Sequence, residues 1–426
     1  MGRPGGQQAR GVALGVRRLI PVCARSVLHP RRGLTIGRMS TSAEPGRTWP
    51  LVGRAAELDD LDDLLSTAAD GVGVTVLLEG EAGVGKTGLV DALRGSARLL
   101  DVELRSAQAS DVRGWPFALL SDALLVRSSA GHGAGRSPVE AELADLLDAM
   151  YAEPARSVAR YDRAAELFAA LLRRHGDIRP WALVLEDVHK ADAPSLEVLL
   201  QLAHEGAVPR ALVVLTMRPV PYRPELAELV AAWTRAGARY LELRPLSARA
   251  TVELAENLVG GPVGPSLRGT LATTGGNPRL IADVVRTARA AGALVASDGV
   301  LDSAGTRWMT PLDEVVRQRV EYLGPDVLAL LGQASVLGTS FVIADLASLA
   351  GDPVADCWRT LRHGLAAGVV RARGDRLVFG HDLVREALYN GLEPDQRRAL
   401  HARAAWALRQ AGAPAQIVTG HLERAR

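Results

Sequence analysis

Between residue 50 and about residue 242, short continuous apolar runs alternate with longer segments in which apolar residues recur every three to four positions. Runs such as "GVTVLLEG", "WALVL" and "ALVVLTM" are typical of strands buried on both faces of a sheet. The segments between them, such as "GLVDALRGSARLL", have helical spacing. The alternation predicts an α/β domain at residues 50–242, with a parallel sheet flanked by helices.

The pattern changes after that domain. Residues 243–308 have helical periodicity, and Ser247 is a candidate N-cap. Residues 309–393 contain helices followed by "GVVRARGDRLVFG", which predicts two short strands joined in a β-hairpin. Residues 394–426 resemble the first helical pair of a solenoid. Because stable arrays need about three repeats or more, we expect this segment to be the start of a longer array.

The first 49 residues differ from the rest in charge. They contain nine arginines and one acid, Glu44, so this leader carries +8 and the remainder −6 of the net +2. Two interpretations stay open, a transit-peptide-like leader or an extension upstream of a true start near Met39. In both, the leader lies outside the fold. The mildly acidic remainder argues against a large nucleic-acid-binding face.

Cysteine content and hydropathy limit the location of the protein. No run approaches the ~18–20 continuous apolar residues of a membrane helix, so no membrane partner is expected. Cys23 and Cys357 are too few for a disulfide framework or a metal site, which favours a reducing cytoplasm.

The strongest functional motif is Gly80-x-x-x-x-Gly85-Lys86-Thr87, between a predicted buried strand and a predicted helix. Its glycines let backbone N–H groups point at phosphate oxygens, and the helix N-terminus adds positive charge. Lys86 is one of only two lysines among 50 basic residues, and its compact ammonium suits the β- and γ-phosphates better than a guanidinium. Thr87 would place a hydroxyl on Mg²⁺. The predicted nucleotide-binding loop comprises Gly80, Glu81, Ala82, Gly83, Val84, Gly85, Lys86, Thr87 and Gly88.

The predicted strand "WALVL" ends in two carboxylates, Glu186 and Asp187. Because such strand ends lie beside the P-loop, we expect one carboxylate to help hold Mg²⁺ and the other to polarise an attacking water. Which of the two meets the metal stays open. Lys190, the other lysine, is interpreted as a surface residue rather than a second catalytic lysine.

The order of the motifs resembles the STAND class of AAA+-related signalling ATPases. The motifs are "LVGRAAELDDL", the P-loop, "VLEDVHKAD", "VVLTMRP", "TGGNPRLI" and "FGHDLVREALYNGL". In particular, residues 50–426 resemble the ATPase part of the large LuxR-type, MalT-like bacterial transcriptional regulators. The resemblance implies ATP or ADP with Mg²⁺ as cofactors, a helical lid at 243–308, a winged-helix domain at 309–393 and tetratricopeptide-like repeats from 394.

Further site residues come from this resemblance. Val52, Gly53 and Arg54 match a segment that cups the adenine side of the nucleotide, and they also fit a simple turn into the first helix. Arg218 follows the strand "ALVVLTM" and resembles the sensor arginine that contacts the γ-phosphate.

Two motifs in the C-terminal half also match family positions. Pro278 would pack on the adenine from the lid, and this is compatible with its place after Asn277, a favourable N-cap. His381 would contact the β-phosphate and hold the ADP form closed, while Asp382 is a candidate cap of the helix "LVREALYNGL". A neutral imidazole donates one hydrogen bond to phosphate, and protonation would add charge.

The sequence departs from the family pattern in the acidic strand. Its first acid is usually aspartate, whereas Glu186 stands here, and Lys190 replaces a common tryptophan. Both differences concern hydrolysis rather than nucleotide binding.

The ordered motifs predict an ATP/ADP-driven signalling switch and slow ATPase, closed with ADP and forming a homo-oligomer with ATP. An unknown inducer or regulatory protein is expected to control it. DNA would be contacted only through a helix-turn-helix that lies outside this chain. Two alternatives stay open: an AAA+-type turnover ATPase acting on a protein or nucleic acid, and a non-hydrolysing assembly scaffold.

Overall fold

The computed structural model describes residues 51–110, 115–124, 137–152, 158–206, 208, 210–219 and 224–426. The basic leader, including Cys23, Met39 and Glu44, lies outside the described residues, so neither interpretation of it is tested. Thr48–Arg426 forms one compact unit.

The predicted parallel sheet is confirmed. Its five strands run in the order β2-β3-β4-β1-β5, and every neighbouring pair is parallel. β3 and β4 are buried along their whole length, as their continuous apolar runs predict. The strands are β1 (Val74–Gly80), β2 (Glu103–Gln108), β3 (Trp181–Glu186), β4 (Ala211–Met217) and β5 (Arg239–Leu243). This order places the carboxyl end of β4 next to that of β1, and the carboxyl end of β3 one strand further along the same edge.

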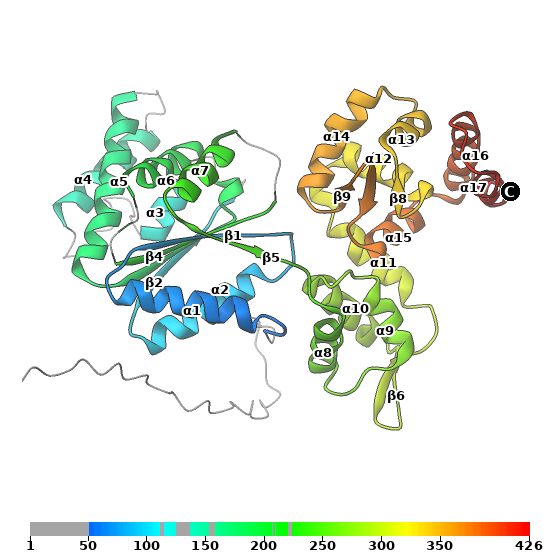
Figure 1. Ribbon diagram of the computed structural model, residues 1–426, viewed down its shortest axis with the longest axis horizontal. Coiled ribbons are helices and arrows are strands. Elements are labelled where there is room, and N and C mark those ends of the chain that lie inside the picture. The colour runs from blue at the N-terminus through cyan, green and yellow to red at the C-terminus, as the bar shows by residue number, and fades with distance from the viewer. Residues whose placement is uncertain are drawn as a thin grey trace, which may run out of the picture. The chain divides into compact units, whose positions relative to one another are not determined.

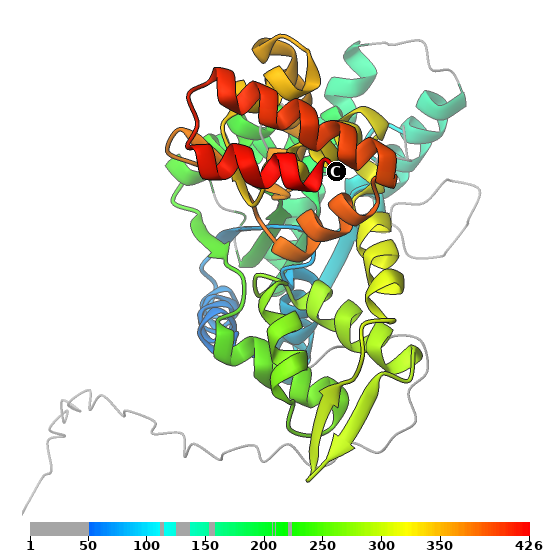
Figure 2. The ribbon, with the colours of Figure 1, turned by 90° about the vertical axis from the view of Figure 1, so that its right-hand side faces the viewer.

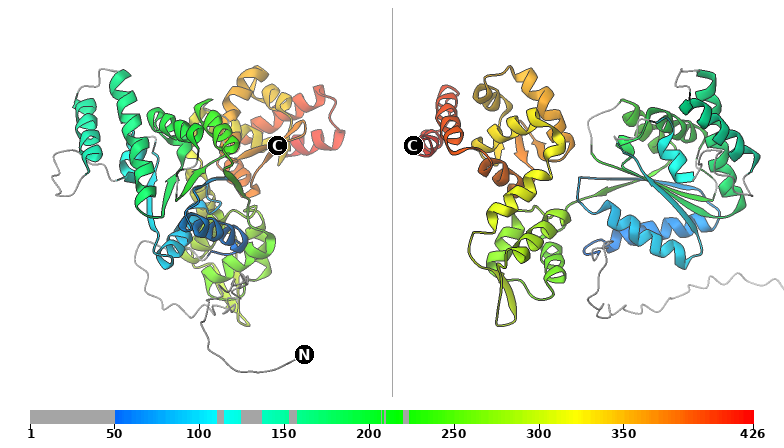
Figure 3. Two further views of the ribbon diagram at one scale, coloured as in Figure 1. Left: turned by 60° about the vertical axis from the view of Figure 1, so that its left-hand side comes forward. Right: turned by 180° about the vertical axis from the view of Figure 1, so that it is seen from behind.

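Helices cover both faces of this sheet (Figures 1 and 3). On one face, α1 (Ala55–Ala69) and α2 (Lys86–Leu99) share a core with one side of the strands. On the other face, a larger core holds the remaining helices of this region. These are α3 (Ala118–Leu124), α4 (Pro138–Ala152), α5 (Val158–Ile178), the 3₁₀ helix η1 (Val188–Lys190), α6 (Ala193–Glu205) and α7 (Pro224–Arg235).

Residues after β5 form helices, as predicted, and also a hairpin that the helical periodicity did not predict. The elements are α8 (Ala248–Val259), α9 (Pro265–Ala272), α10 (Pro278–Ala290), β6 (Leu294–Ser297) and β7 (Val300–Ser303). Ser247 caps α8, because its Oγ accepts a hydrogen bond from the Ala250 N–H at 3.2 Å. β6 and β7 pair in antiparallel fashion (Figure 2). Their turn is "DG", a recognised hairpin signal.

The next segment combines helices with a three-stranded sheet in the order β8-β10-β9. Its elements are α11 (Met309–Gln318), η2 (Glu321–Leu323), α12 (Pro325–Leu337), β8 (Ser340–Phe341), α13 (Ile343–Ala350), α14 (Val354–Ala366), β9 (Val370–Arg373), β10 (Arg376–Phe379) and α15 (Asp382–Asn390). β9 and β10 form the predicted hairpin. The prediction that Asp382 caps α15 is wrong. His381 is the N-cap residue, without a side-chain cap, and Asp382 is the first helical residue.

Two further helices, α16 (Pro394–Gln410) and α17 (Ala415–Arg424), pack side by side (Figure 2). Buried polar contacts join them to α15. Tyr389 Oη lies 2.9 Å from His401 Nε2, and His401 Nδ1 lies 2.9 Å from His421 Nδ1. Within the described part of the chain, no helix is long and apolar enough to cross a membrane.

Candidate functional site

The P-loop connects β1 to α2 at the edge where the strand ends converge. Gly83 and Gly85 have φ values of +79° and +108°, which favour glycine. A Cβ on Gly80 would lie 2.8 Å from Val84 Cγ1 and 3.0 Å from the Leu243 carbonyl oxygen. The loop therefore requires glycine for its curvature at two positions and for close packing at a third.

Lys86 is folded back onto this loop. Its Nζ donates hydrogen bonds to the carbonyl oxygens of Gly80 at 2.6 Å and Glu81 at 3.0 Å. Burial lowers the pKa of Lys86 to about 8, against the opposing effect of Asp187. A buried ammonium that contacts only neutral carbonyls in these bonds is suited to an anionic ligand such as a phosphate.

Glu186 and Thr87 lie in contact. Thr87 Oγ1 donates a hydrogen bond to Glu186 Oε2 at 2.9 Å, and Arg94 Nη2 lies 3.7 Å from Glu186 Oε1. Burial raises the pKa of Glu186 despite the hydrogen bond from Thr87. A hydroxyl beside a carboxylate is the kind of oxygen pair that holds Mg²⁺ together with phosphate and water. Among the described residues, no group of three or more His, Cys, Asp and Glu side chains could hold a metal by itself.

Asp187 makes its hydrogen bonds to residues outside this pair. Its backbone is left-handed, with φ +55°. Its N–H donates to Thr216 Oγ1 at 3.0 Å, and its Oδ2 accepts from Gln108 Nε2 at 3.1 Å. These contacts fix Asp187 between the ends of β2 and β4, so the two carboxylates of the motif point to different neighbours.

His189 is a buried residue of this region that sequence analysis did not select. Neither ring nitrogen has a hydrogen-bond partner among the described residues. Its Nδ1 lies 4.0 Å from Asp187 Oδ1, and burial lowers its pKa to about 4. The only sequence signal for it is its place two positions after the acidic pair.

Arg218 lies directly after β4, as predicted, and therefore near the end of β1. Its Nε is buried without a hydrogen-bond partner among the described residues. Its guanidinium carbon lies 5.5 Å from the centroid of the Tyr322 ring, which is in η2. Arg218 also contributes to lowering the Lys86 pKa, so its charge acts at the P-loop.

The start of α10 contacts the P-loop directly. Asn277 caps α10 through Oδ1, and its Nδ2 donates to the Ala82 carbonyl oxygen at 2.9 Å. The Arg279 N–H lies 3.3 Å from the Gly83 carbonyl oxygen. Pro278 Cγ would lie 3.9 Å from a Cβ on Gly85. The structure thus brings Pro278 to the loop. It also shows that Asn277 and Arg279 contact the loop, which the local chemistry of a helix start does not reveal.

The segment before α1 also reaches the P-loop. Arg54 donates through Nη2 to the carbonyl oxygens of Val84 at 3.1 Å and Arg244 at 2.6 Å. Val52 is buried in the core that includes α8. Gly53 has φ +65°, and a Cβ there would lie 2.8 Å from Ala250 Cβ. These residues join the loop to α8, and contact with adenine stays a prediction.

His381 and Arg371 bring a third part of the chain to the P-loop. His381 is buried, and its Nε2 lies 3.5 Å from Glu81 Oε2. Arg371 Nε donates to Glu81 Oε1 at 2.7 Å. His381 Nδ1 has no hydrogen-bond partner among the described residues. His381 was selected from the sequence, whereas Arg371 was not.

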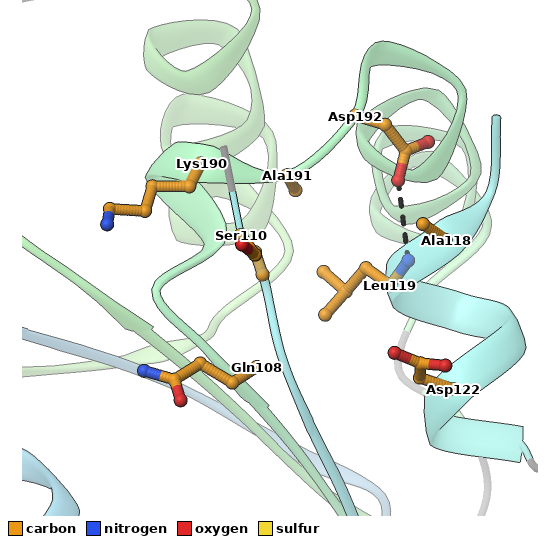
Figure 4. A pocket seen from close by; sticks show the side chains of 9 residues that line it. Gln108, Ser110, Ala118, Leu119, Asp122, Lys190, Ala191 and Asp192 are labelled. Carbon is orange, nitrogen blue, oxygen red and sulfur yellow. Dashed lines mark hydrogen bonds between the residues drawn. The ribbon is translucent and has the colours of Figure 1, made fainter. Parts of the chain in front are cut away.

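A separate small pocket lies at the ends of β2 and β3 (Figure 4). Its lining includes Lys190, whose ammonium points away from Asp122 and Asp192. Asp192 caps α6 and accepts hydrogen bonds from the N–H groups of Ser195 and Phe117. No P-loop residue lines this pocket. That Lys190 has no catalytic role stays a prediction.

Comparison with known proteins agrees with this geometry. Residues 50–215 match the AAA ATPase domain family. The chain carries a P-loop AAA-type ATPase domain. An uncharacterised protein of Rhizobium meliloti (strain 1021) is 27% identical over 421 residues, covering 88% of this chain and 39% of that protein. The chain thus spans well under half the length of this relative.

The fold is shared with a solved structure that matches at a TM-score above 0.5. A Walker-type ATPase of Pyrococcus abyssi matches 82% of this chain and 99% of its own, with 16% identity and a TM-score of 0.53. A STAND protein with a tetratricopeptide repeat sensor from Pyrococcus horikoshii matches 88% of this chain and 48% of its own, with 16% identity and a TM-score of 0.35.

Proposed function

We propose that this chain is an ATP/ADP-binding signalling switch with slow ATPase activity, the nucleotide-binding part of a LuxR-type regulator. The observation that carries the proposal is the convergence of three separate segments on one P-loop. Arg54 binds the loop from before α1, Asn277 from the start of α10, and Arg371 from β9. A nucleotide in this loop would therefore affect contacts that all three segments make.

The residues at the P-loop fit a nucleotide with Mg²⁺. Backbone N–H groups of the loop and the Lys86 ammonium would bind the phosphates. Thr87 and Glu186 would hold Mg²⁺, whose charge offsets that of the phosphates. Asp187, turned toward β2 and β4, would orient the attacking water, and Arg218 would contact the γ-phosphate.

Two further segments would regulate the site. Residues 243–308 would act as a helical lid, with Pro278 packed on the adenine opposite the Val52–Arg54 segment. Residues 309–393 would act as a winged-helix domain that holds the ADP form closed through His381. ATP would favour an open form that self-associates, because only differential contacts with the two nucleotides can shift the population. An inducer would bias this equilibrium, and DNA contact would require a helix-turn-helix elsewhere.

The test is to denature freshly purified protein and identify the nucleotide that it carried. We expect about one ADP per chain. Lys86→Ala should lose it and weaken ATP binding at least about 100-fold, since a buried cation that meets the phosphates is removed. Lys190→Ala is the matched control, because it removes the other lysine, which lines a small pocket that no P-loop residue lines. Full ATP affinity in Lys86→Ala would refute the proposal.

The AAA ATPase match also suits a turnover ATPase that works on a protein or nucleic acid. Such an enzyme would purify without nucleotide and show rapid multiple turnover stimulated by its substrate. A switch should instead retain its product. An assembly scaffold would lose self-association on truncation after residue 393, whatever nucleotide is present.

A further inference from the structure

Glu81 is an unusual group to find in a phosphate-binding loop, because it carries a negative charge. Its carboxylate is largely buried, with 14% of the side chain exposed. Arg371 contacts Oε1 twice, through Nε at 2.7 Å and Nη2 at 2.5 Å. His381 Nε2 approaches Oε2 at 3.5 Å. The loop carboxylate is therefore neutralised by the guanidinium of Arg371, which lies 290 residues away in the chain.

The fit around this carboxylate is close. Gly368 precedes β9, and a Cβ on it would lie 2.7 Å from Glu81 Cδ. Gly368 also has φ +73°, so glycine is favoured there on two grounds. The segment that carries Arg371 is thus shaped to receive Glu81 and does not merely meet it at a surface.

The charge of Glu81 acts where phosphates would bind. Burial raises the pKa of Glu81, but the contacts from His381 and Arg371 outweigh it and hold the pKa below its ordinary value. The carboxylate is therefore ionised at neutral pH. It also favours the charged form of Lys86, so its field reaches the lysine that would meet the phosphates. Without the positive charge of Arg371, this carboxylate would repel a nucleotide.

We propose that Arg371 and Glu81 form a charge latch, in which Arg371 neutralises the loop carboxylate while residues 309–393 are docked on the P-loop. When that segment withdraws, the uncompensated carboxylate weakens the hold on the phosphates and promotes nucleotide exchange. By linkage, bound ADP favours the docked arrangement. The latch deepens the proposed switch and rests on it. Arg371 is a positioning residue here, since it acts on nucleotide through Glu81.

The latch is able to open. The Arg371 side chain is 44% exposed, so water can replace Glu81 as its partner when the pair separates. Because one partner of the pair is nearly half-exposed, we expect the pair to contribute little to overall stability. The effect of this pair should therefore appear in nucleotide binding rather than in unfolding.

The experiment measures the affinity and dissociation rate of a fluorescent ADP analogue, mant-ADP, with the full chain. Arg371→Ala should weaken binding about tenfold, mainly through faster dissociation. Arg373→Ala is the matched control, because it removes an exposed arginine from the same strand, two positions along. It should bind as the unaltered protein does, and both variants should unfold at the same temperature.

A double-mutant cycle separates the latch from direct phosphate binding. In a Glu81→Gln background there is no carboxylate charge to neutralise, so adding Arg371→Ala should change mant-ADP affinity by less than about twofold. A tenfold loss that persists in this background would overturn the latch and make Arg371 a direct phosphate ligand. Equal affinity of Arg371→Ala and the unaltered protein would also overturn it. Failure of the unaltered protein to bind mant-ADP would instead refute the proposed switch.

Discussion

Asp283 is a fully buried carboxylate on α10, with 0% of its surface exposed. Arg319, just after α11, contacts it in a bidentate manner, with Nε to Oδ2 and Nη2 to Oδ1 both at 3.1 Å. Arg286 reaches Oδ1 at 3.0 Å from the next turn of α10. Because the carboxylate has no contact with bulk water, its negative charge is compensated by these two guanidinium groups.

We predict that Arg319→Ala destabilises the protein much more than Arg286→Ala. Removing one partner of a fully buried pair costs ~3–5 kcal/mol. Arg319 is itself 35% exposed and Arg286 stays nearby, so we expect ~2–3 kcal/mol. Arg286 is 58% exposed and contacts one oxygen, so its removal should cost less than ~1 kcal/mol.

The assay is thermal or urea-induced unfolding of both variants beside the unaltered protein. At ~2–4 °C per kcal/mol, Arg319→Ala should lower the midpoint by roughly 5–10 °C. The Asp283→Asn change should recover part of the loss when combined with Arg319→Ala, since no buried charge is then left unpaired. Equal destabilisation by Arg319→Ala and Arg286→Ala would refute the reasoning, because the bidentate contact would then have no special weight.

Three further predictions concern the P-loop and the C-terminal helices. Asn277→Ala should weaken mant-ADP binding severalfold, because Asn277 contacts the P-loop. Ser247→Ala is the control: it removes a similar helix cap, worth ~1 kcal/mol, that does not contact the loop, and it should leave binding unchanged. Glu186→Gln should abolish the dependence of ATP binding on Mg²⁺ in a magnesium titration, and Asp187→Asn should retain it, because Glu186 contacts Thr87. Burial, and then the neighbouring His421 on α17, lower the pKa of His401 to about 4. Between about pH 6.5 and 4, His401 is therefore protonated in the unfolded chain but not in the folded protein. Stability should be highest above pH 6.5 and fall toward pH 4, by on the order of 2 kcal/mol, and His401→Gln should flatten that slope in pH-dependent unfolding.

The parts of the fold that were predictable from the sequence are those determined by short-range geometry. The P-loop, the acidic end of β3 and the caps Ser247 and Asn277 each depend on a few consecutive residues, and each is present. The β6–β7 hairpin was missed because helical periodicity was extended across its turn. The wrong cap at Asp382 arose because a good capping residue lay one position inside the helix.

Contacts between distant segments could not be predicted in the same way. The pairing of Glu81 with Arg371 depends on how residues 309–393 dock, and nothing near either residue specifies the other. The same holds for the contact of Asn277 with Ala82, since the local sequence accounts fully for its capping role. A sequence pattern explains why a residue suits its own element, whereas docking decides which loop it touches.

The buried pair of Asp283 and Arg319 has a consequence for how the switch would open. It fixes the end of α11 to α10, so the proposed lid and the segment that follows it should move as one body. The contacts of Asn277 and Arg371 with the P-loop would then be lost together rather than in sequence. A single opening step that releases both contacts would make nucleotide exchange cooperative. Weakening the Asp283–Arg319 pair should uncouple the two contacts, so that Arg371→Ala in an Arg319→Ala background changes mant-ADP dissociation less than it does alone.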